Sequence, residues 1–524
     1  MNKPRNKSTE GSLFNPSRRD FLKGVSAAAV AGGIPIGLGS LAVPEASGAR
    51  PQLNNNKEKF VGIQIGGVSF TDEGVDKVLD ILQERAGVNA LMLVTFAYGR
   101  EVAGRQLPNQ PLPDHGVQQY DTNTFHGGNY AEVHPEFYRD TAFHDLRAPD
   151  LGKFDILGDV IPKAKARKIK SYCWFIDDIN PRYLDGFAQM AAEVDAYGRT
   201  TRRTCLNNPH VRELLVSLVE DWIKSYDVDG IMWGSERQGP LNNAIERPAM
   251  GGFGGGAQLV CFCPYCRKKG KERGIDVERA REGFKTLEQW VETVRGGHRP
   301  ADGYFVTFWR VLANYPEIVA WEKLWTDNQH EVYGLLYGEV KSARPEIPIG
   351  WHLWHNNSFS PFCRAELDYR RFVGVSDFLK VVMYNNCAGP RLARYIDNVH
   401  STVFGDLSPE EVLNVDYKFL GYKGEKSLNE IPQTGLSATY VAEETKRALA
   451  DVQERVPIYS GIDVDVPTGQ NEKKTTPEDV RNAVRAALTT GAQGVILSRK
   501  YSEMWLDHLG GAGQALKDLG IWKG

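Results

Sequence analysis

Two patterns of apolar and polar positions follow one another repeatedly along the chain. Short, nearly continuous apolar runs alternate with amphipathic segments whose apolar residues lie three and four positions apart. Apolar runs of strand length are typical of parallel sheets that helices cover on both faces. We count eight such runs, at residues 60–70, 88–99, 169–178, 228–236, 347–357, 377–386, 456–467 and 492–503. Eight strands separated by helices predict an α/β fold of the (β/α)8 barrel type, with long insertions in the loops that follow the strands.

Local signals agree with this interpretation. Asn208-Pro209 and Thr476-Pro477 each place a capping side chain and a proline where a helix is expected to begin. A doubly wound open sheet is the competing architecture, but the first strand is followed only by Gly66-Gly67 and not by a glycine-rich dinucleotide turn. Residues 100–153 are longer than an ordinary connection, and we interpret them as a functional lid, with a decorative loop as the alternative. We interpret the helical segment at about 267–346 as an insertion in the barrel.

The first 49 residues have the pattern of an export signal. Basic residues precede the sequence SRRDFLK at residues 17–23, an Ala- and Gly-rich apolar run follows at residues 25–43, and small residues end it at 47–49. This predicts a twin-arginine signal that the twin-arginine export machinery recognises, a mature barrel over residues 50–524, and a periplasmic or extracellular location. A membrane anchor is the alternative, although Pro35 interrupts the run. No later apolar run is long enough to span a bilayer, so we expect no membrane span in the mature protein.

The amino-acid composition limits the classes of binding partner that we expect. The 63 basic and 66 acidic residues leave a net charge of -3, which gives no electrostatic reason to expect nucleic acid. The 11 Trp, 21 Tyr and 22 Phe residues suit surfaces on which sugar rings stack, although most such rings pack in cores. We expect a carbohydrate partner and no organic cofactor.

The carboxyl ends of the eight predicted strands carry reactive and polar side chains. In a barrel these ends meet at one mouth, where active sites lie. The candidates there are Trp174, Asp177 and Asp178 after the third strand, Glu236 after the fourth, Trp351, His352 and His355 on the fifth, Tyr384 and Asn385 after the sixth, Asp463 and Asp465 after the seventh, and Arg499 and Glu503 after the eighth.

Cleavage of a glycosidic bond requires a protonated carboxylic acid on one face of the sugar and an ionised carboxylate on the other. The fourth and seventh strands lie on opposite sides of a barrel. We therefore predict Glu236 as the acid/base and Asp465 or Asp463 as its partner. Glu503 is a third possibility, and the remaining polar and aromatic side chains are predicted to bind substrate. For each indole and histidine alone, a role in packing or in internal hydrogen bonding is the competing interpretation.

Three of the seven cysteines form a Cys-x-Cys-x-x-Cys cluster at Cys261, Cys263 and Cys266. This spacing brings three thiolates around one metal ion more readily than it forms unstrained disulfides, and Cys205 is the candidate fourth ligand. In an oxidising compartment disulfides are the alternative.

Together, these motifs resemble those of known protein families. Cys205, the Asn208-Pro209 helix start, the acid at Glu236 and the cysteine cluster together resemble the first half of family 42 β-galactosidases, over residues 202–266. The chain also resembles the glycoside-hydrolase-like barrels of exported bacterial proteins with CFCPYC-like motifs. The resemblance implies a structural zinc ion held by Cys205, Cys261, Cys263 and Cys266, and an acid/base role for Glu236. Two positions depart from the family pattern: Ser235 stands where the family has Asn, and the seventh strand ends in Asp residues rather than Glu.

The sequence thus predicts an exported glycoside hydrolase that acts on an oligo- or polysaccharide. A catalytically silent carbohydrate-binding barrel is one alternative, and it gains support if Glu236 is buried against Arg237. A metal-dependent hydrolase of the deacetylase kind, using Asp177, Asp178 and a histidine of the fifth strand, is another.

Overall fold

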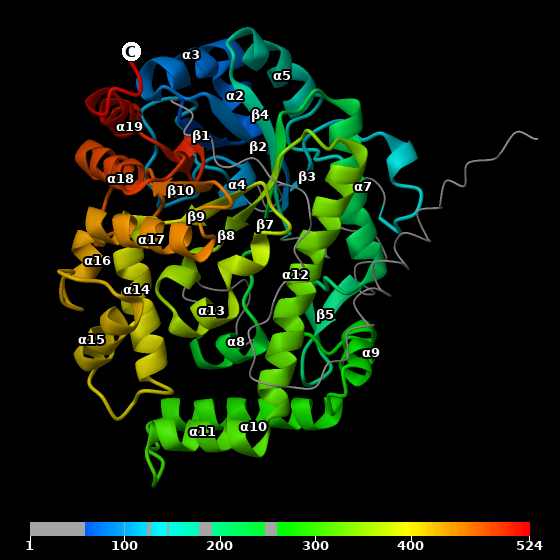
Figure 1. Ribbon diagram of the computed structural model, residues 1–524, viewed down its shortest axis with the longest axis vertical. Coiled ribbons are helices and arrows are strands. Elements are labelled where there is room, and N and C mark those ends of the chain that lie inside the picture. Colours follow the sequence, from blue (N-terminus) through cyan, green and yellow to red (C-terminus); the bar gives the residue numbers. More distant parts are fainter. Residues whose placement is uncertain (1–57, 99, 123–126, 144–145, 178–190, 247–258) are drawn as a thin grey trace, which may run out of the picture. The chain divides into compact units, whose positions relative to one another are not determined.

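The chain folds around a closed barrel of eight parallel strands (Figure 1). The computed structural model describes residues 58–98, 100–122, 127–143, 146–177, 191–246 and 259–524; the predicted signal segment lies outside these residues. The barrel strands are β1 (Phe60–Ile65), β2 (Ala90–Tyr98), β4 (Lys170–Ile176), β7 (Gly230–Gly234), β8 (Ile349–Leu353), β9 (Phe378–Val382), β10 (Ile458–Asp463) and β11 (Gly494–Ser498). They pair in this order, and β11 closes the ring by pairing with β1 in parallel. The predicted (β/α)8 fold class is confirmed.

Helices follow the strands as the apolar spacing predicted. The main ones are α3 (Val75–Ala86), α5 (Ile156–Ala166), α7 (Pro209–Ser225), α12 (Glu317–Ala343), α14 (Asn385–His400), α17 (Ala438–Asp451), α18 (Pro477–Thr490) and α19 (Leu506–Asp518). The Asn208 side chain accepts a hydrogen bond from the amide of His210, and Thr476 forms a capping box with Asp479. Both predicted helix starts are therefore confirmed.

The strands are shorter than the apolar runs suggested. The first run was expected to extend to residue 70, but β1 ends at Ile65 and α2 (Gly67–Glu73) follows it. Similarly, β7 ends at Gly234 and β8 at Leu353, so the polar residues that follow lie on loops at the mouth of the barrel. The apolar pattern continued beyond the strands because these loop and helix residues are themselves buried against the barrel.

Insertions enlarge the barrel between its strands. The segment predicted as a lid contains α4 (Arg100–Ala103), the short strand β3 (Gly127–Asn129), which pairs antiparallel with β2, and the 3-10 turn η1 (Pro135–Phe137). A two-stranded sheet of β5 (Ala192–Val194) and β6 (Thr200–Thr204) precedes α7. The predicted helical insertion comprises α9 (Pro264–Glu272), α10 (Val277–Arg295), α11 (Tyr304–Asn314) and α12, and α11 and α12 are separated at Pro316 as expected.

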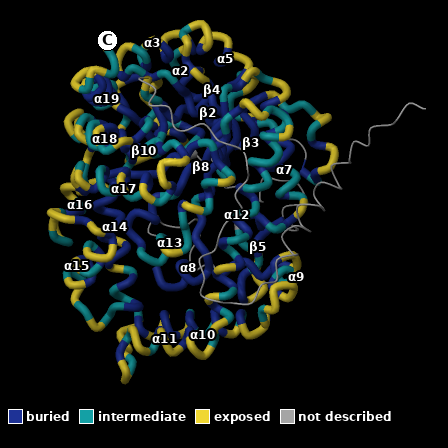
Figure 2. The backbone as a smooth tube through the Cα atoms, viewed as in Figure 1, coloured by how far each residue is buried: buried dark blue, intermediate teal, exposed yellow. Residues whose placement is uncertain are grey.

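The core has two layers around the strands. Side chains that point inward from the barrel wall, including Met92, Trp174 and Met232, fill its interior, and a larger cluster fills the space between strands and helices. Figure 2 shows barrel strands such as β2, β4 and β8 as buried, whereas α15 (Pro409–Leu420) and α16 (Ile431–Thr434) have exposed surfaces. Among the described helices, none combines the length and the apolar character needed to cross a bilayer.

Candidate functional site

Glu236 lies at the mouth of the barrel, two residues beyond the end of β7. Its side chain is 39% exposed, and its Oε1 atom lies 2.9 Å from Nε2 of His352 on β8. A Cβ atom at Gly234 would come within 3.1 Å of the His352 Cβ, so the missing side chain at Gly234 allows this histidine to lie close against β7. Glu236 is therefore an accessible carboxylate whose hydrogen-bond partner, His352, is held in place.

Behind His352 a chain of polar groups runs across the inside of the barrel. Nδ1 of His352 lies 3.0 Å from Nζ of Lys380, which also donates to Oε1 of Gln64 on β1 at 2.8 Å and to the Tyr384 hydroxyl at 2.8 Å. Lys380 is fully buried in the middle of β9. Gly461 on β10 makes room for it, since a Cβ there would lie 2.8 Å from the Lys380 Cε.

We call this chain of polar groups, which runs from His352 through Lys380 to Gln64 and Tyr384, the relay. Its charges and hydrogen bonds determine the protonation state of Glu236. Burial lowers the pKa of Lys380 well below its ordinary value, and burial together with Lys380 lowers the pKa of His352 to about 4. The imidazole is therefore neutral near pH 7, and because Lys380 donates to Nδ1, the ring proton lies on Nε2 and points to Glu236. Burial raises the pKa of Glu236, but the hydrogen bond from His352 and the charges of Arg391 and Lys380 outweigh it, so the net pKa is lowered. Glu236 is thus held as a carboxylate.

The two aspartates of the seventh strand do not share a face. Asp463 is the last residue of β10, fully buried, and its oxygens accept the backbone N–H groups of Cys387 at 2.9 Å and Val466 at 3.1 Å. Burial raises the pKa of Asp463 to about 6. Alternation along a strand would place Asp463 and Asp465 on one face, but β10 ends at Asp463, so the alternation does not extend to Asp465.

Asp465 has a left-handed backbone with φ of 59° and turns toward α19. Its carboxylate accepts the Trp505 amide at 2.8 Å and lies 2.8 Å from Nδ1 of His508. The Asp465 side chain thus ties the loop after β10 to the start of α19.

The residues predicted at the end of the third strand form a separate group. Asp177 is buried and accepts hydrogen bonds from Ser235 Oγ at 2.7 Å, while Arg237 Nε lies 3.0 Å from the same carboxylate. Trp174 points into the barrel with its ring stacked 6.4 Å from the His352 ring, and it is 4% exposed. Asp178 lies outside the described residues.

Of the residues predicted on the fifth strand, Trp351 lies on β8, whereas His355 follows it in a 3-10 turn (His355–Ser358) with its ring 5.4 Å from that of Tyr384. Trp351 is fully buried on the outer face of the barrel, where it packs on Trp233 and Tyr333 and donates to the Val375 carbonyl at 2.9 Å. Both nitrogens of His355 are engaged within the chain, by Arg391 at 2.8 Å and by the Tyr440 hydroxyl at 3.1 Å.

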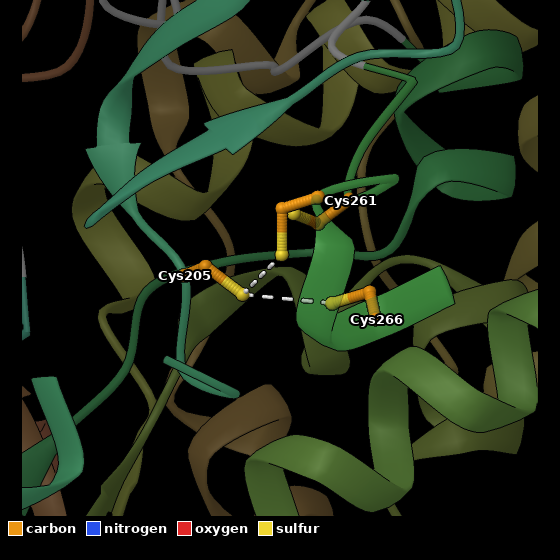
Figure 3. A group of neighbouring side chains, drawn as sticks. Cys205, Cys261 and Cys266 are labelled. Carbon is orange, nitrogen blue, oxygen red and sulfur yellow. Dashed lines mark hydrogen bonds between the residues drawn. The ribbon is translucent and has the colours of Figure 1, made fainter. Parts of the chain in front are cut away.

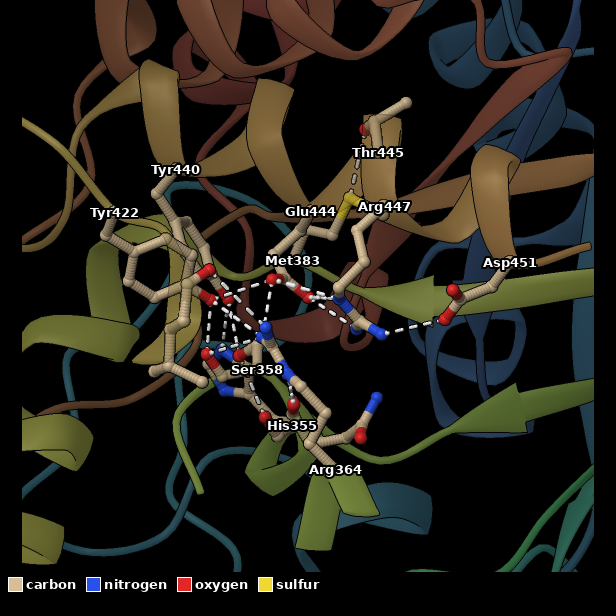
Figure 4. Close-up of polar contacts among 12 residues, drawn as sticks. His355, Ser358, Arg364, Met383, Tyr422, Tyr440, Glu444, Thr445, Arg447 and Asp451 are labelled. Carbon is tan, nitrogen blue, oxygen red and sulfur yellow. Dashed lines mark hydrogen bonds and ion pairs between the residues drawn. The ribbon is translucent and has the colours of Figure 1, made fainter. Parts of the chain in front are cut away.

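His355 belongs to a buried polar network behind the mouth (Figure 4). At its centre, the carboxylate of Glu444 is paired with the guanidinium groups of Arg364 at 2.6 Å and Arg447 at 2.7 Å and accepts the Tyr422 hydroxyl. The network joins α17 to the loop after β8, so the role that these contacts define for His355 is to hold that loop in place.

The remaining predicted contacts lie near the relay or on the eighth strand. Tyr384 is 5% exposed and bonded to Lys380, and Asn385 donates to Asn386 at 3.4 Å. Arg499 pairs with the buried Glu503 at 3.2 Å. Of the predicted mouth residues, the structure therefore brings Glu236, His352, Trp174 and Tyr384 together.

Four cysteines converge at one point beside α9. The Sγ atoms of Cys205, Cys261, Cys263 and Cys266 all lie within 4.8 Å of one another, and Cys205 is 3.5 Å from both Cys263 and Cys266. Figure 3 shows the side chains of Cys205, Cys261 and Cys266 directed toward a common centre. Zinc–sulfur bonds of about 2.3 Å in a tetrahedron place the sulfur atoms about 3.8 Å apart, which this group matches. All seven cysteines are free thiols.

Sequence reasoning missed two members of the relay, Gln64 and Lys380. Each is a polar residue in the middle of an apolar strand, in VGIQI and in FLKVV. A charged side chain on a strand that helices cover from outside must point into the barrel and find partners there, because burying it alone is costly. That pattern was the available signal.

No protein-family model matches this chain, and no curated protein is similar to it. Solved structures with a similar course of the chain include a glycoside hydrolase domain of PgaB (BpsB) from Bordetella bronchiseptica, with 12% identity and a TM-score of 0.48 over 89% of this chain and 100% of that one. Others are a β-galactosidase from Halorubrum lacusprofundi (12%, 0.49, 89% of this chain and 58% of that one) and an α-L-fucosidase from Paenibacillus thiaminolyticus (13%, 0.47, 88% and 50%). The chain thus spans about half the length of the last two. We base the functional proposal on the residues of this chain.

Proposed function

We propose that this protein is an exported glycoside hydrolase that acts on an oligo- or polysaccharide at the mouth of its barrel. The observation that carries the proposal is the accessible carboxylate of Glu236, fixed at 2.9 Å by His352 at the carboxyl end of the fourth barrel strand. The ionised carboxylate of a glycosidase acts as nucleophile or as the base for water, and the lowered pKa of Glu236 favours the ionised form that both roles use. We therefore assign Glu236 the ionised role first, rather than that of the initial proton donor.

For the protonated partner we propose Asp463. It lies on the opposite side of the barrel, and it shares the inward face of β10 with Gly461, which contacts Lys380. Its pKa, raised by burial to about 6, has shifted in the direction that a general acid needs. Since the carboxyl is fully buried and accepts two backbone N–H groups, the assignment requires that substrate binding exposes it. Asp465, tied to Trp505 and His508, is the weaker candidate.

The residues whose contacts would favour the two alternative functions are bonded to other partners. A silent binding barrel would be supported by an ion pair between Glu236 and Arg237, but Arg237 pairs with Asp177. The metal-dependent hydrolase would use Asp177, Asp178 and a histidine of the fifth strand. Asp178 lies outside the described residues, Asp177 is bonded to Ser235 and Arg237, and His352 is bonded to Glu236 and Lys380.

The test is hydrolysis of a panel of aryl glycosides and plant and microbial polysaccharides by the mature protein, compared with Glu236→Gln and Asp463→Asn. We expect at least one substrate to be cleaved, and Glu236→Gln to lose that activity while its circular dichroism and melting temperature are unchanged. A panel that is not cleaved, or a Glu236→Gln protein as active as the wild type, would refute the proposal. If Asp463→Asn loses stability but keeps its turnover, the assignment of Asp463 as the partner is wrong, while that of Glu236 is unaffected.

The cysteine group supports a structural zinc ion, held by Cys205, Cys261, Cys263 and Cys266. Bound there, zinc would link the loop before α7 to the start of α9 and would stabilise the fold, with no part in the bond cleavage. Export is proposed from the first 49 residues alone. Replacing Arg18 and Arg19 by Lys is expected to leave the precursor in the cytoplasm, whereas the wild-type protein is expected in the periplasm or medium with a new N-terminus near residue 50; cell fractionation and N-terminal sequencing measure both.

A further inference from the structure

A second pocket lies outside the barrel wall, behind Glu236. It is partly open to solvent and lies between the loops after β7 and β8 and the first half of α12. Ser235 and Arg237 line it, whereas Glu236 does not. Ser235 continues the outward face of β7 after Trp233, which packs on Tyr333 of α12, while Glu236 continues the inward face after Gly234. The pocket and the mouth of the barrel are therefore on opposite sides of this strand end.

The floor of the pocket is made of buried amides whose hydrogen bonding is half complete. Gln238, Asn242, Asn356 and Asn357 are each 7% exposed or less. One end of each amide holds the wall: Asn356 donates to Gln238 at 2.8 Å, Asn242 donates to Glu366 at 2.9 Å, and Asn357 donates to the Tyr369 hydroxyl.

The other end of each amide has no partner within the described part of the chain. These atoms are Gln238 Nε2 and the Oδ1 atoms of Asn242, Asn356 and Asn357. A buried polar atom left without a hydrogen bond costs about 1–3 kcal/mol, so four of them around one pocket are unfavourable unless something in the pocket bonds to them.

The rest of the lining is aromatic, aliphatic or polar, and it includes one guanidinium group, of Arg237, and one carboxyl group, of Glu366. Trp325 and Trp354 are half-buried indoles at the pocket, which can cover the C–H faces of a ring. The charge of Arg237 is balanced by Asp177 at 3.0 Å and by Glu193 at 3.7 Å. Burial and the neighbouring Glu322 raise the pKa of Glu366 well above its ordinary value, which favours the neutral form of this carboxyl. A charged ligand would meet no counter-charge here.

From this arrangement we propose that the pocket behind Glu236 is a second, non-catalytic binding site for a neutral pyranose sugar. Amide donors and acceptors that converge with indole faces match the alternating hydroxyl groups and C–H faces of such a ring, and small-molecule sites commonly combine an apolar lining with a few placed polar groups in this way. The proposal does not depend on catalysis at Glu236. A sugar held here would anchor a neighbouring part of a polysaccharide, or a released product, outside the reaction centre.

The test is binding of galactose, glucose, mannose, xylose, lactose and cellobiose to the mature Glu236→Gln protein, measured by saturation-transfer NMR and calorimetry. Galacturonate and glucose 6-phosphate serve as charged comparators. The pocket variants are Trp325→Ala, which removes a half-buried indole, and Gln238→Leu, which removes a buried amide of similar size. Trp309→Ala is the matched control, because Trp309 is a 62% exposed indole on α11.

We expect at least one neutral sugar to bind, each pocket variant to weaken that binding by about tenfold or more, and Trp309→Ala to bind as the parent does. The charged comparators are expected to bind more weakly than galactose or glucose. If no neutral sugar binds, or if both pocket variants bind it unchanged, the pocket holds water only and the proposal is wrong. Should Gln238→Leu fail to fold, Trp325→Ala decides the result. Hydrolysis by the wild type is scored separately, so either proposal can fail without the other.

Discussion

Oε1 of Glu236 lies 2.9 Å from Nε2 of His352, and the opposite nitrogen of the same ring lies 3.0 Å from the buried Nζ of Lys380. Through His352, the buried amine of Lys380 therefore affects the ionisation of the partly exposed carboxylate of Glu236. This relationship connects β7, β8 and β9, three consecutive strands of the barrel. It also makes His352 a positioning residue, whose effect should be visible in a pH profile.

Replacing His352 by Ala removes the hydrogen bond that lowers the pKa of Glu236. We expect kcat/KM to fall about 10- to 100-fold and the acidic limb of its pH profile to move to higher pH, because Glu236 then protonates more readily. His352→Gln keeps an N–H donor and should restore part of both. A profile whose acidic limb stays in place in His352→Ala would show that the relay does not set the ionisation of Glu236.

Asp465 is expected to act as an anchor. Asp465→Ala removes the acceptor of the Trp505 amide and the partner of His508, so we expect a loss of about 1–3 kcal/mol in the free energy of unfolding. The pKa of His508, which burial lowers but Asp465 raises to a higher net value, should fall in the variant, as NMR titration would show. Asp507→Ala, at an exposed neighbour, is the control for the loss of stability. Lost turnover with unchanged stability would instead make Asp465 the catalytic partner.

The four-cysteine group predicts one zinc ion per chain. Purified wild-type protein should release one equivalent on unfolding in the presence of a chromogenic chelator, and X-ray absorption should show four sulfur ligands at about 2.3 Å. Cys266→Ser should lose the metal and melt at a lower temperature. Cys363→Ser, at a buried cysteine outside the group, should keep it. Disulfides detected by mass spectrometry among these four cysteines would contradict the zinc site.

Glu246 predicts a specific dependence of stability on pH. Burial raises its pKa to about 8, above an unfolded value near 4.5, although the Ser360 hydroxyl donates to it. The folded protein thus favours the protonated form. The stability that this group contributes is complete below pH 4.5 and is lost as the pH rises toward 8, by at most about 1.4 kcal/mol per pH unit.

Glu246→Gln should abolish this part of the dependence. Its melting temperature is expected to exceed that of the wild type by more at pH 8 than at pH 5. Glu136→Gln, at an exposed acid on η1, should behave like the wild type at both values. Equal differences at the two pH values would mean that Glu246 is ionised in the folded protein.

Local patterns were sufficient for the barrel. A strand that is buried on both faces must be apolar along its whole length, and an amphipathic helix must repeat every three to four residues, so runs such as residues 88–99 and 456–467 could be recognised without any contact being known. The capping residues Asn208 and Thr476 are also local, since each bonds within its own first turn. Glu236 could be placed at the mouth because it directly follows a predicted strand.

Only the tertiary structure decided which polar residues meet. Asp465 left the inward face because its backbone turns after β10, and His355 was drawn into the network of Tyr440 and Arg391 rather than toward Glu236. Lys380 lies beside His352 because β9 pairs with β8 in a register that places the two residues opposite one another, although they are 28 positions apart in the sequence. Strand register and loop path set such contacts between elements, and residue spacing along the chain carries little information about either. The sequence by itself thus determined the barrel and its accessible acid, and the fold determined the relay that ionises that acid and the amide-lined pocket behind it.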